Sequence, residues 1–236
     1  MAAAAATGAA VALLTSRLRG DYLAIVTLGF AEVVRLAAGN ETALTGGLDG
    51  LSGIPGPWRS TLGPAWFNVE MLALAWVCVA LAAAMLSRLS AAPWGRVLRA
   101  IREDETVAAV AGKRVLAYKV QAFALGAGLL GLAGALYAHY TSYIAPDGMT
   151  ALVTLQVVLA LTAGGTGRVA GAVCGALLVV TLTEGSRFLA PLVAWVTPVQ
   201  FAALREIAVA VLLIALLQLR PGGLLPERPR RHSTPG

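Results

Sequence analysis

The sequence predicts an all-α membrane protein, a polytopic bundle of about seven transmembrane helices. Of its 236 residues, 58% are hydrophobic and 13% are charged, whereas soluble domains have about 45–50% and about 25%. Apolar runs recur along the whole chain at lengths that suit a lipid bilayer. The formal net charge is +6, and the basic residues gather in short segments beside these runs. Such a distribution indicates membrane orientation rather than nucleic-acid binding.

Seven apolar segments are candidate spans, of which the first and the fifth are short. A helix needs roughly 20 apolar residues to cross about 30 Å of hydrocarbon. The segments predict a transmembrane domain over residues 1–220 and a basic cytoplasmic tail over residues 221–236. The candidate spans are Ala2–Ser16, Asp21–Ala38, Phe67–Ser87, Tyr118–Tyr140, Met149–Ala163, Val169–Ala190 and Val199–Leu219.

The Lys and Arg residues alternate with the span count. They follow the first, third, fifth and seventh spans, with only Arg168 after the fifth, and are nearly absent from the other connections, where only Arg59 occurs. Because basic loops stay in the cytoplasm, this pattern predicts a cytoplasmic C-terminus and an N-terminus outside. The apolar segment Met1 to Thr15 lacks the basic region that opens a signal peptide. An outside N-terminus with no leading basic segment favours the hypothesis that upstream spans are missing.

The outer connection, Gly39–Trp66, is rich in glycine and proline. Residues of these types favour turns, and glycine also allows positive φ and close backbone approach. One interpretation is a solvated loop. The other is irregular backbone packed against the mouth of a pore, which is tolerated where it is buried in protein or wet.

The cytoplasmic connection, Arg88–Ala117, predicts a short amphipathic helix within Gly95–Arg114. Apolar residues recur there at helical spacing, and Gly112 is a plausible helix stop. Three adjacent carboxylates, Glu103, Asp104 and Glu105, interrupt a region that is otherwise basic. They fit either a solvated charged helix or, better, a protein partner with a basic or polar groove.

Five segments resemble, in the same order along the chain, the permeases of branched-chain amino acid ABC importers. One of them, AIREDETVAAVAG (100–112), resembles the helix with which such permeases dock on an ATPase. The others are RLRGDYLAIVTLGFAEVVR (17–35), LTGGLDGLSGIP (44–55), YKVQAFALGAGLLGLAGALYA (118–138) and GGTGRVAGAVCGA (164–176).

The resemblance implies an ATPase-coupling role for five residues of this helix. Val107 stands where the family pattern has the first alanine of Glu–Ala–Ala, and a β-branched residue there costs a little helix propensity but still fits a buried face. The implied coupling residues are Glu103, Asp104, Glu105, Ala108 and Gly112.

The resemblance further implies a permease subunit in the bacterial cytoplasmic (inner) membrane that carries branched-chain amino acids. Its implied partners are a second permease, two ATP-binding cassette subunits, an extracytoplasmic solute-binding protein and membrane lipid, with no nucleic acid. ATP and Mg are expected on the ATPases, so this chain would bind no cofactor or metal and catalyse no reaction. The alternatives are a permease for urea, amides or another small metabolite, an ion-coupled secondary transporter, and an inactive remnant.

Charged residues inside the spans need a reason, because a charge at the bilayer centre costs about 2.5–3.5 kcal/mol on insertion scales. Two pairs at i,i+3 spacing are candidates for the outer lining of the pathway, with structural ion pairs as the other interpretation. These are Glu32 with Arg35 and Glu184 with Arg187.

Small residues four apart predict close helix packing, and they are Gly131 with Ala135 and Gly171 with Gly175. No set of residues has the pattern of a catalytic site.

Overall fold

The computed structural model describes residues 1–16, 18, 20–57, 59, 63–185, 198–220 and 222–225. The chain forms two compact units, Met1–Ala151 and Leu152–Gly236. Arg187 and most of the predicted basic tail lie outside the described residues.

A helix is present at each of the seven predicted spans, which confirms the all-α fold. The observed helices differ from the predicted spans mainly at their ends, since the third and fourth are longer, and residues 186–190 of the sixth span lie outside the described residues. They are α1 (Ala2–Leu14), α2 (Asp21–Asn40), α4 (Pro64–Ala91), α7 (Val115–Thr141), α8 (Ala151–Gly164), α9 (Val169–Gly185) and α10 (Pro198–Leu219).

Helices α4 and α7 are the longest, with 28 and 27 residues. At 1.5 Å per residue each extends about 40 Å, more than the roughly 30 Å of hydrocarbon. Within the part of the chain that the structure describes, four segments are long and apolar enough to cross a membrane: Tyr22–Asn40, Trp66–Ala91, Val115–Thr141 and Pro146–Gly164. Two shorter apolar helices, Ala2–Leu14 and Val169–Gly185, accompany them.

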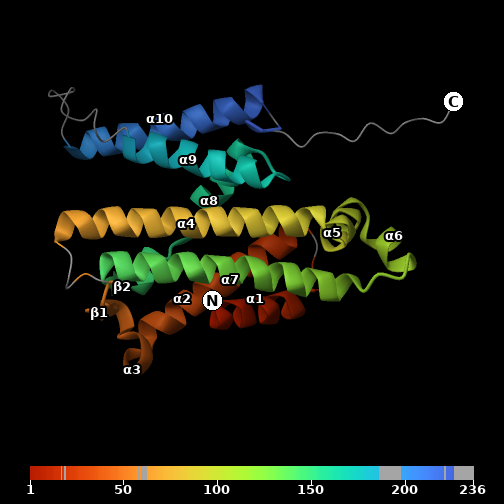
Figure 1. Ribbon diagram of the computed structural model, residues 1–236, viewed down its shortest axis with the longest axis horizontal. Coiled ribbons are helices and arrows are strands. Elements are labelled where there is room, and N and C mark those ends of the chain that lie inside the picture. The colour runs from red at the N-terminus through yellow and green to blue at the C-terminus, as the bar shows by residue number, and fades with distance from the viewer. Residues whose placement is uncertain are drawn as a thin grey trace. The chain divides into compact units, whose positions relative to one another are not determined.

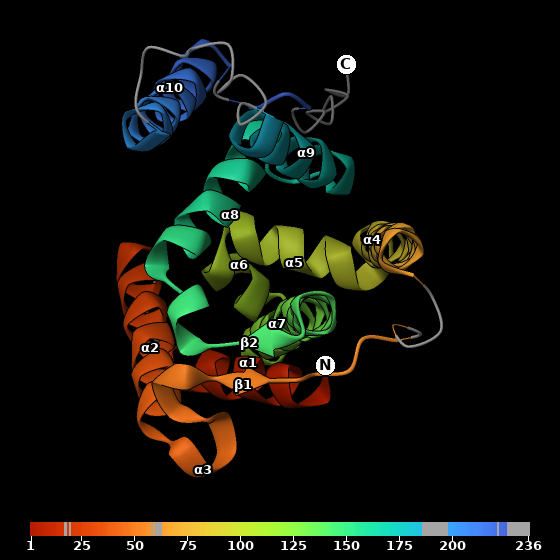
Figure 2. The same cartoon turned by 90° about the vertical axis from the view of Figure 1, so that its left-hand side faces the viewer.

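The first unit is built around α7. Helix α1 lies along α7, and α4 runs in the opposite direction on another side of it (Figures 1 and 2). Glycines allow the close approach of α1, because a Cβ built on Gly131 would overlap the Cβ of Ala4 and one on Gly8 would lie 2.9 Å from the carbonyl oxygen of Phe123. Many apolar side chains of α4, Trp76 among them, remain exposed on the isolated chain, as expected for surfaces that meet lipid or other subunits.

The connection Gly39–Trp66, which the sequence predicts to face outside, is folded rather than extended. It contains α3 (Thr42–Thr45), the 3₁₀ turn η1 (Gly47–Asp49) and the strand β1 (Leu51–Ser52). This strand pairs antiparallel with β2 (Tyr143–Ile144), so that Leu51 lies opposite Ile144, and a second 3₁₀ turn, η2 (Pro146–Gly148), follows β2. Gly50, at φ +69°, allows this contact because any Cβ there would overlap the carbonyl oxygen of Ile144.

Two helices form the connection Arg88–Ala117, where the sequence predicts one. They are α5 (Pro93–Glu103) and α6 (Glu105–Val110). The helix breaks at Asp104, which has extended backbone angles and caps α6, because an Asp side chain that bonds nearby backbone N–H groups favours a helix start over a helix interior.

In the second unit, α8 and α9 cross at very short distance. Gly171 and Gly175 are buried, and a Cβ on Gly164 would overlap the carbonyl oxygen of Gly171. Ala160, Ala163 and Val179 form the apolar core of this unit. In the first unit, by contrast, Ala135 is exposed while Gly131 lies against α1.

Candidate functional site

Helix α5 lies across the end of α4, transverse to it (Figures 1 and 2). Pro93 opens α5 directly after α4 ends at Ala91, and proline suits the first turn of a helix because it needs no hydrogen-bond partner there. The Arg99 guanidinium donates to the carbonyl oxygen of Ser90 at 2.9 Å, and that of Arg96 donates to Ala91 at 3.3 Å. These bonds satisfy carbonyls at the end of α4 that have no partner within the helix.

Helix α6 has six residues and is closed at both ends. The Asp104 carboxylate accepts from the backbone N–H groups of Thr106 (2.7 Å) and Val107 (3.0 Å). At the other end, Gly112 has φ +76°, and the N–H of Lys113 donates to the carbonyl of Ala108 at 3.1 Å. This last bond is the 6→1 bond of a Schellman motif. A helix this short depends on its caps and tertiary contacts, because helix nucleation is unfavourable.

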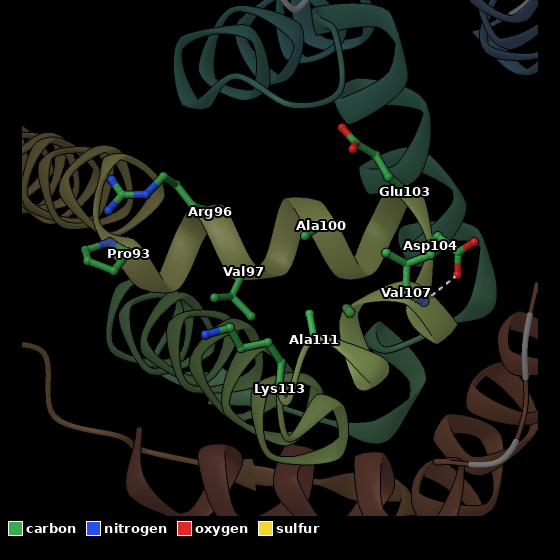
Figure 3. A pocket seen from close by; sticks show the side chains of 10 residues that line it. Pro93, Arg96, Val97, Ala100, Glu103, Asp104, Val107, Ala111 and Lys113 are labelled. Carbon is green, nitrogen blue, oxygen red and sulfur yellow. Dashed lines mark hydrogen bonds between the residues drawn. The ribbon is translucent and has the colours of Figure 1, made fainter.

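A groove of about 470 Å³ opens in the angle between α5 and α6 (Figure 3). Its lining combines apolar side chains with charges of both signs. The lining residues are Pro93, Arg96, Val97, Ala100, Glu103, Asp104, Val107, Ala108, Ala111 and Lys113.

The five predicted coupling residues lie within this bend but face different ways. Glu103 is exposed at the groove, whereas Ala108 is buried at 4% exposure. Asp104 caps α6, and Gly112 ends it. The Glu105 carboxylate pairs with the ammonium of Lys119 on α7 at 2.8 Å. Glu103 therefore presents its carboxylate outward. Glu105 instead binds α7, and Ala108 is buried within the bend.

The exposure of Val107 differs from what the sequence predicted. The valine was expected on a buried face, but it is 64% exposed. It lines the groove beside Glu103 and Ala111. That expectation came from the family pattern, whereas the helical spacing placed Val97, Ile101 and Ala108 on one side, and of these Ile101 and Ala108 are buried. An exposed β-branched residue in a groove is a candidate contact with a partner.

Of the charge pairs predicted inside the spans, one is fully described. The Arg35 guanidinium bonds the Glu32 carboxylate at 2.5 to 3.1 Å and lies 3.7 Å from Asp147 in η2. Glu32 is half-exposed. Glu184 is exposed on α9, and its predicted partner Arg187 lies outside the described residues.

Two contacts join the outer connection to the end of α7, and a third joins it to Phe67 of α4. The ring Nδ1 of His139 lies 2.8 Å from the carbonyl oxygen of Pro55. The Arg59 guanidinium bonds the hydroxyl of Ser142 and stacks 4.7 Å from the centroid of the Phe67 ring. The connection thus agrees better with packed backbone than with a free loop.

Glu70 on α4 is a charged residue that the sequence interpretation passed over. Its Oε2 atom is buried and has no hydrogen-bond partner among the residues that the structure describes. The available signal was a carboxylate inside a long apolar run. At the same end of α4, a second cavity of about 470 Å³ separates α4 from α7. Its lining residues are Asn68, Met71, Leu72, Ala75, Leu136, Tyr137 and Tyr140.

No group of three or more His, Cys, Asp or Glu side chains could hold a metal ion within the described ranges. The bend instead presents a groove lined by both apolar and charged side chains.

Comparisons with known proteins point in one direction. A profile of the family described as the permease component of the branched-chain amino acid transport system matches residues 1–217. The chain is 32% identical to the high-affinity branched-chain amino acid transport system permease protein LivM of Salmonella typhimurium, over 94% of this chain and 55% of that protein. The LivM protein of Escherichia coli is 31% identical with the same coverage.

A third relative is a probable branched-chain amino acid transport permease protein LivM of Methanocaldococcus jannaschii, 28% identical over 94% of this chain and 65% of its own length. The chain therefore spans about half the length of the two bacterial relatives. No solved structure matches.

Proposed function

This chain belongs to the permease component family of the branched-chain amino acid transport system, and we propose that it is a permease subunit of an ABC importer for branched-chain or similar amino acids. The family consists of transport permeases, which are not enzymes. Family membership and the apolar helices make the chain a multi-pass protein of the inner membrane. An ion-coupled secondary transporter is not favoured.

The bend formed by α5 and α6 is the proposed docking site for a partner ATPase. The single observation that carries this proposal is the groove, whose lining includes exposed Glu103 from α5 and exposed Val107 from α6 (Figure 3). An apolar side chain beside a carboxylate fits the mixed composition of a protein interface. ATP and Mg would be held by the partner, and closure of two such ATPases would move this bend.

Binding to the ATPase is tested by Val107→Asp, with Val110→Asp as the matched control. Both valines are exposed residues of α6, but only Val107 lines the groove. The chain is coexpressed with its second permease and the ATPases, extracted in mild detergent, and the copurified ATPase is measured. We expect Val107→Asp to reduce it about tenfold, since a charge buried at an interface costs at least ~1.4 kcal/mol.

The control should retain the ATPase at the wild-type level. Equal retention in both variants, or equal loss, would contradict docking in the groove. Absence of ATPase from the wild-type chain, extracted with its partner permease, would contradict the importer assignment itself.

The opposite end of the first unit is the proposed outer mouth of the pathway. Glu32 and Arg35 form an ion pair in α2 at this end, close to Asp147 in η2. The half-exposed Glu32 carboxylate can meet a polar solute, and Glu184 of the second unit is the corresponding candidate. A solute-binding protein would deliver amino acids to this side, with the C-terminus in the cytoplasm.

A further inference from the structure

Two side-chain contacts connect the α5–α6 bend to the first turns of α7. The Trp94 indole N–H donates to the side-chain oxygen of Gln121 at 2.8 Å. The Lys119 ammonium donates to the Glu105 carboxylate, also at 2.8 Å. Both side chains of the ion pair are about a quarter exposed, at 27% and 28%. This partial burial protects the pair from the solvent screening that weakens fully exposed pairs.

The two contacts leave α7 in different directions. Lys119 and Gln121 are two residues apart, so their side chains start about 200° apart around the helix axis. The start of α5 therefore contacts one side of α7, and the start of α6 contacts the other. The bend therefore contacts α7 on two sides and not on a single face.

The two helices of the bend are fixed to each other by buried side chains and by the Asp104 cap. Ile101 of α5 and Ala108 of α6 are buried, at 8% and 4% exposure. Asp104 bonds two backbone N–H groups at the break between the helices. A force on the exposed groove residues would then be carried to the places where the bend is attached.

The attachments of α5 and α6 differ in kind. Helix α5 is bonded to α4 by the guanidinium groups of Arg96 and Arg99, and to α7 by Trp94. The Glu105–Lys119 ion pair joins α6 to α7. Helix α6 also carries Val107, the apolar groove residue proposed to meet the ATPase.

We propose that the Glu105–Lys119 ion pair is a transmission contact that passes movement of the docked bend into α7. Glu105 and Lys119 are thus positioning residues, and α7 is the membrane helix that responds to the ATPase. The inference rests on the proposed docking of an ATPase at the groove. It assigns Glu105 a function that faces inward, distinct from that of Glu103 and Val107.

The test uses the complete importer in proteoliposomes and the variants Glu105→Gln and Lys119→Gln. Three quantities are measured: copurified ATPase, ATP hydrolysis stimulated by the loaded binding protein, and amino acid uptake per ATP hydrolysed. We expect the ATPase to copurify normally and the uptake per ATP to fall about fivefold or more, the usual lower size of an energetic coupling between sites. The exchanged pair, Glu105→Lys with Lys119→Glu, should recover most of the ratio.

Arg114→Gln is the matched control, because it also removes one positive charge at the start of α7 from an exposed side chain. It should keep the wild-type ratio. An unchanged ratio in both single variants with normal ATPase association would overturn the transmission contact and leave the docking proposal intact.

Loss of ATPase association in the single variants would also overturn the inference, because it would place the pair within the docking surface. If no ATPase associates with the wild-type chain, the proposed function itself fails, which is a separate result. Thermal unfolding of each purified variant identifies a general loss of structure.

Discussion

Arg35 holds two acidic groups from different parts of the first unit. Its guanidinium bonds Glu32 one helical turn earlier and lies near Asp147, beyond α7. An arginine in an apolar helix is stabilised when its donors are satisfied in this way. Because Glu32 remains half-exposed, it is available to a solute as well as to Arg35.

Glu32→Gln tests whether this pair belongs to the pathway. The amide removes the charge but keeps a hydrogen-bond acceptor for Arg35. We expect amino acid uptake to fall about fivefold at an unchanged protein level, as if the transport barrier rose by ~1 kcal/mol. Uptake by reconstituted importer, normalised to the amount of protein, measures this effect.

Asp49→Asn in η1 is the control, since Asp49 is an exposed carboxylate of the neighbouring outer connection. It should leave uptake unchanged. Wild-type uptake by Glu32→Gln would identify the pair as a structural ion pair instead.

At the scale of elements, α6 exists because the residues at its ends close it. It has six residues, too few to be stable alone. The Asp104 cap and the turn at Gly112 supply bonds that its own backbone cannot make. The groove depends on this helix, because α6 contributes one of its two walls.

Asp104→Ala should loosen α6, while Asp104→Asn should not. Both substitutions remove a charge, but asparagine keeps the side-chain oxygen that accepts from Thr106 and Val107. Loss of such a cap costs about 1 kcal/mol. Backbone amides of α6 should then exchange hydrogen about fivefold faster in the alanine variant, as measured by mass spectrometry of the detergent-solubilised protein. Equal exchange in the two variants would show that tertiary contacts alone hold α6.

At the scale of the whole molecule, the two ends of the first unit are expected on opposite sides of the membrane. Basic residues surround the α5–α6 end, while the connection between α2 and α4 has few of them. Short basic connections remain in the cytoplasm. Leu44 in α3 and Val110 in α6 are exposed reporters, at 80% and 86%.

Single cysteines at these positions test the orientation in a chain that carries Cys78→Ala and Cys174→Ala. A membrane-impermeant maleimide should label Leu44→Cys in intact spheroplasts. It should label Val110→Cys only after the membrane is permeabilised. The reverse pattern would invert the proposed topology and would place the groove out of reach of an ATPase.

The sequence predicted a helix at each of the seven apolar segments. The length of an apolar run and the charges beside it are local properties of the sequence, and they decide whether a segment can cross a bilayer. It also identified the family to which the chain belongs, and its partner site at residues 100–112 stays a prediction. The ends of α4 and α7 were predicted less well, since a helix continues beyond the apolar core wherever its polar ends remain hydrogen-bonded.

Only the tertiary structure decided which way each residue of that site faces. The family pattern suggested a buried face for Val107, but in α6 this side chain is exposed and lines the groove. The partner of Glu105 lies 14 residues further along the chain, a separation that no helical spacing specifies. The sequence likewise did not predict that Pro55 contacts His139 or that Arg59 contacts Ser142. Local sequence patterns therefore determined where helices form, whereas contacts between residues distant in sequence determined which side chains are left free for partners.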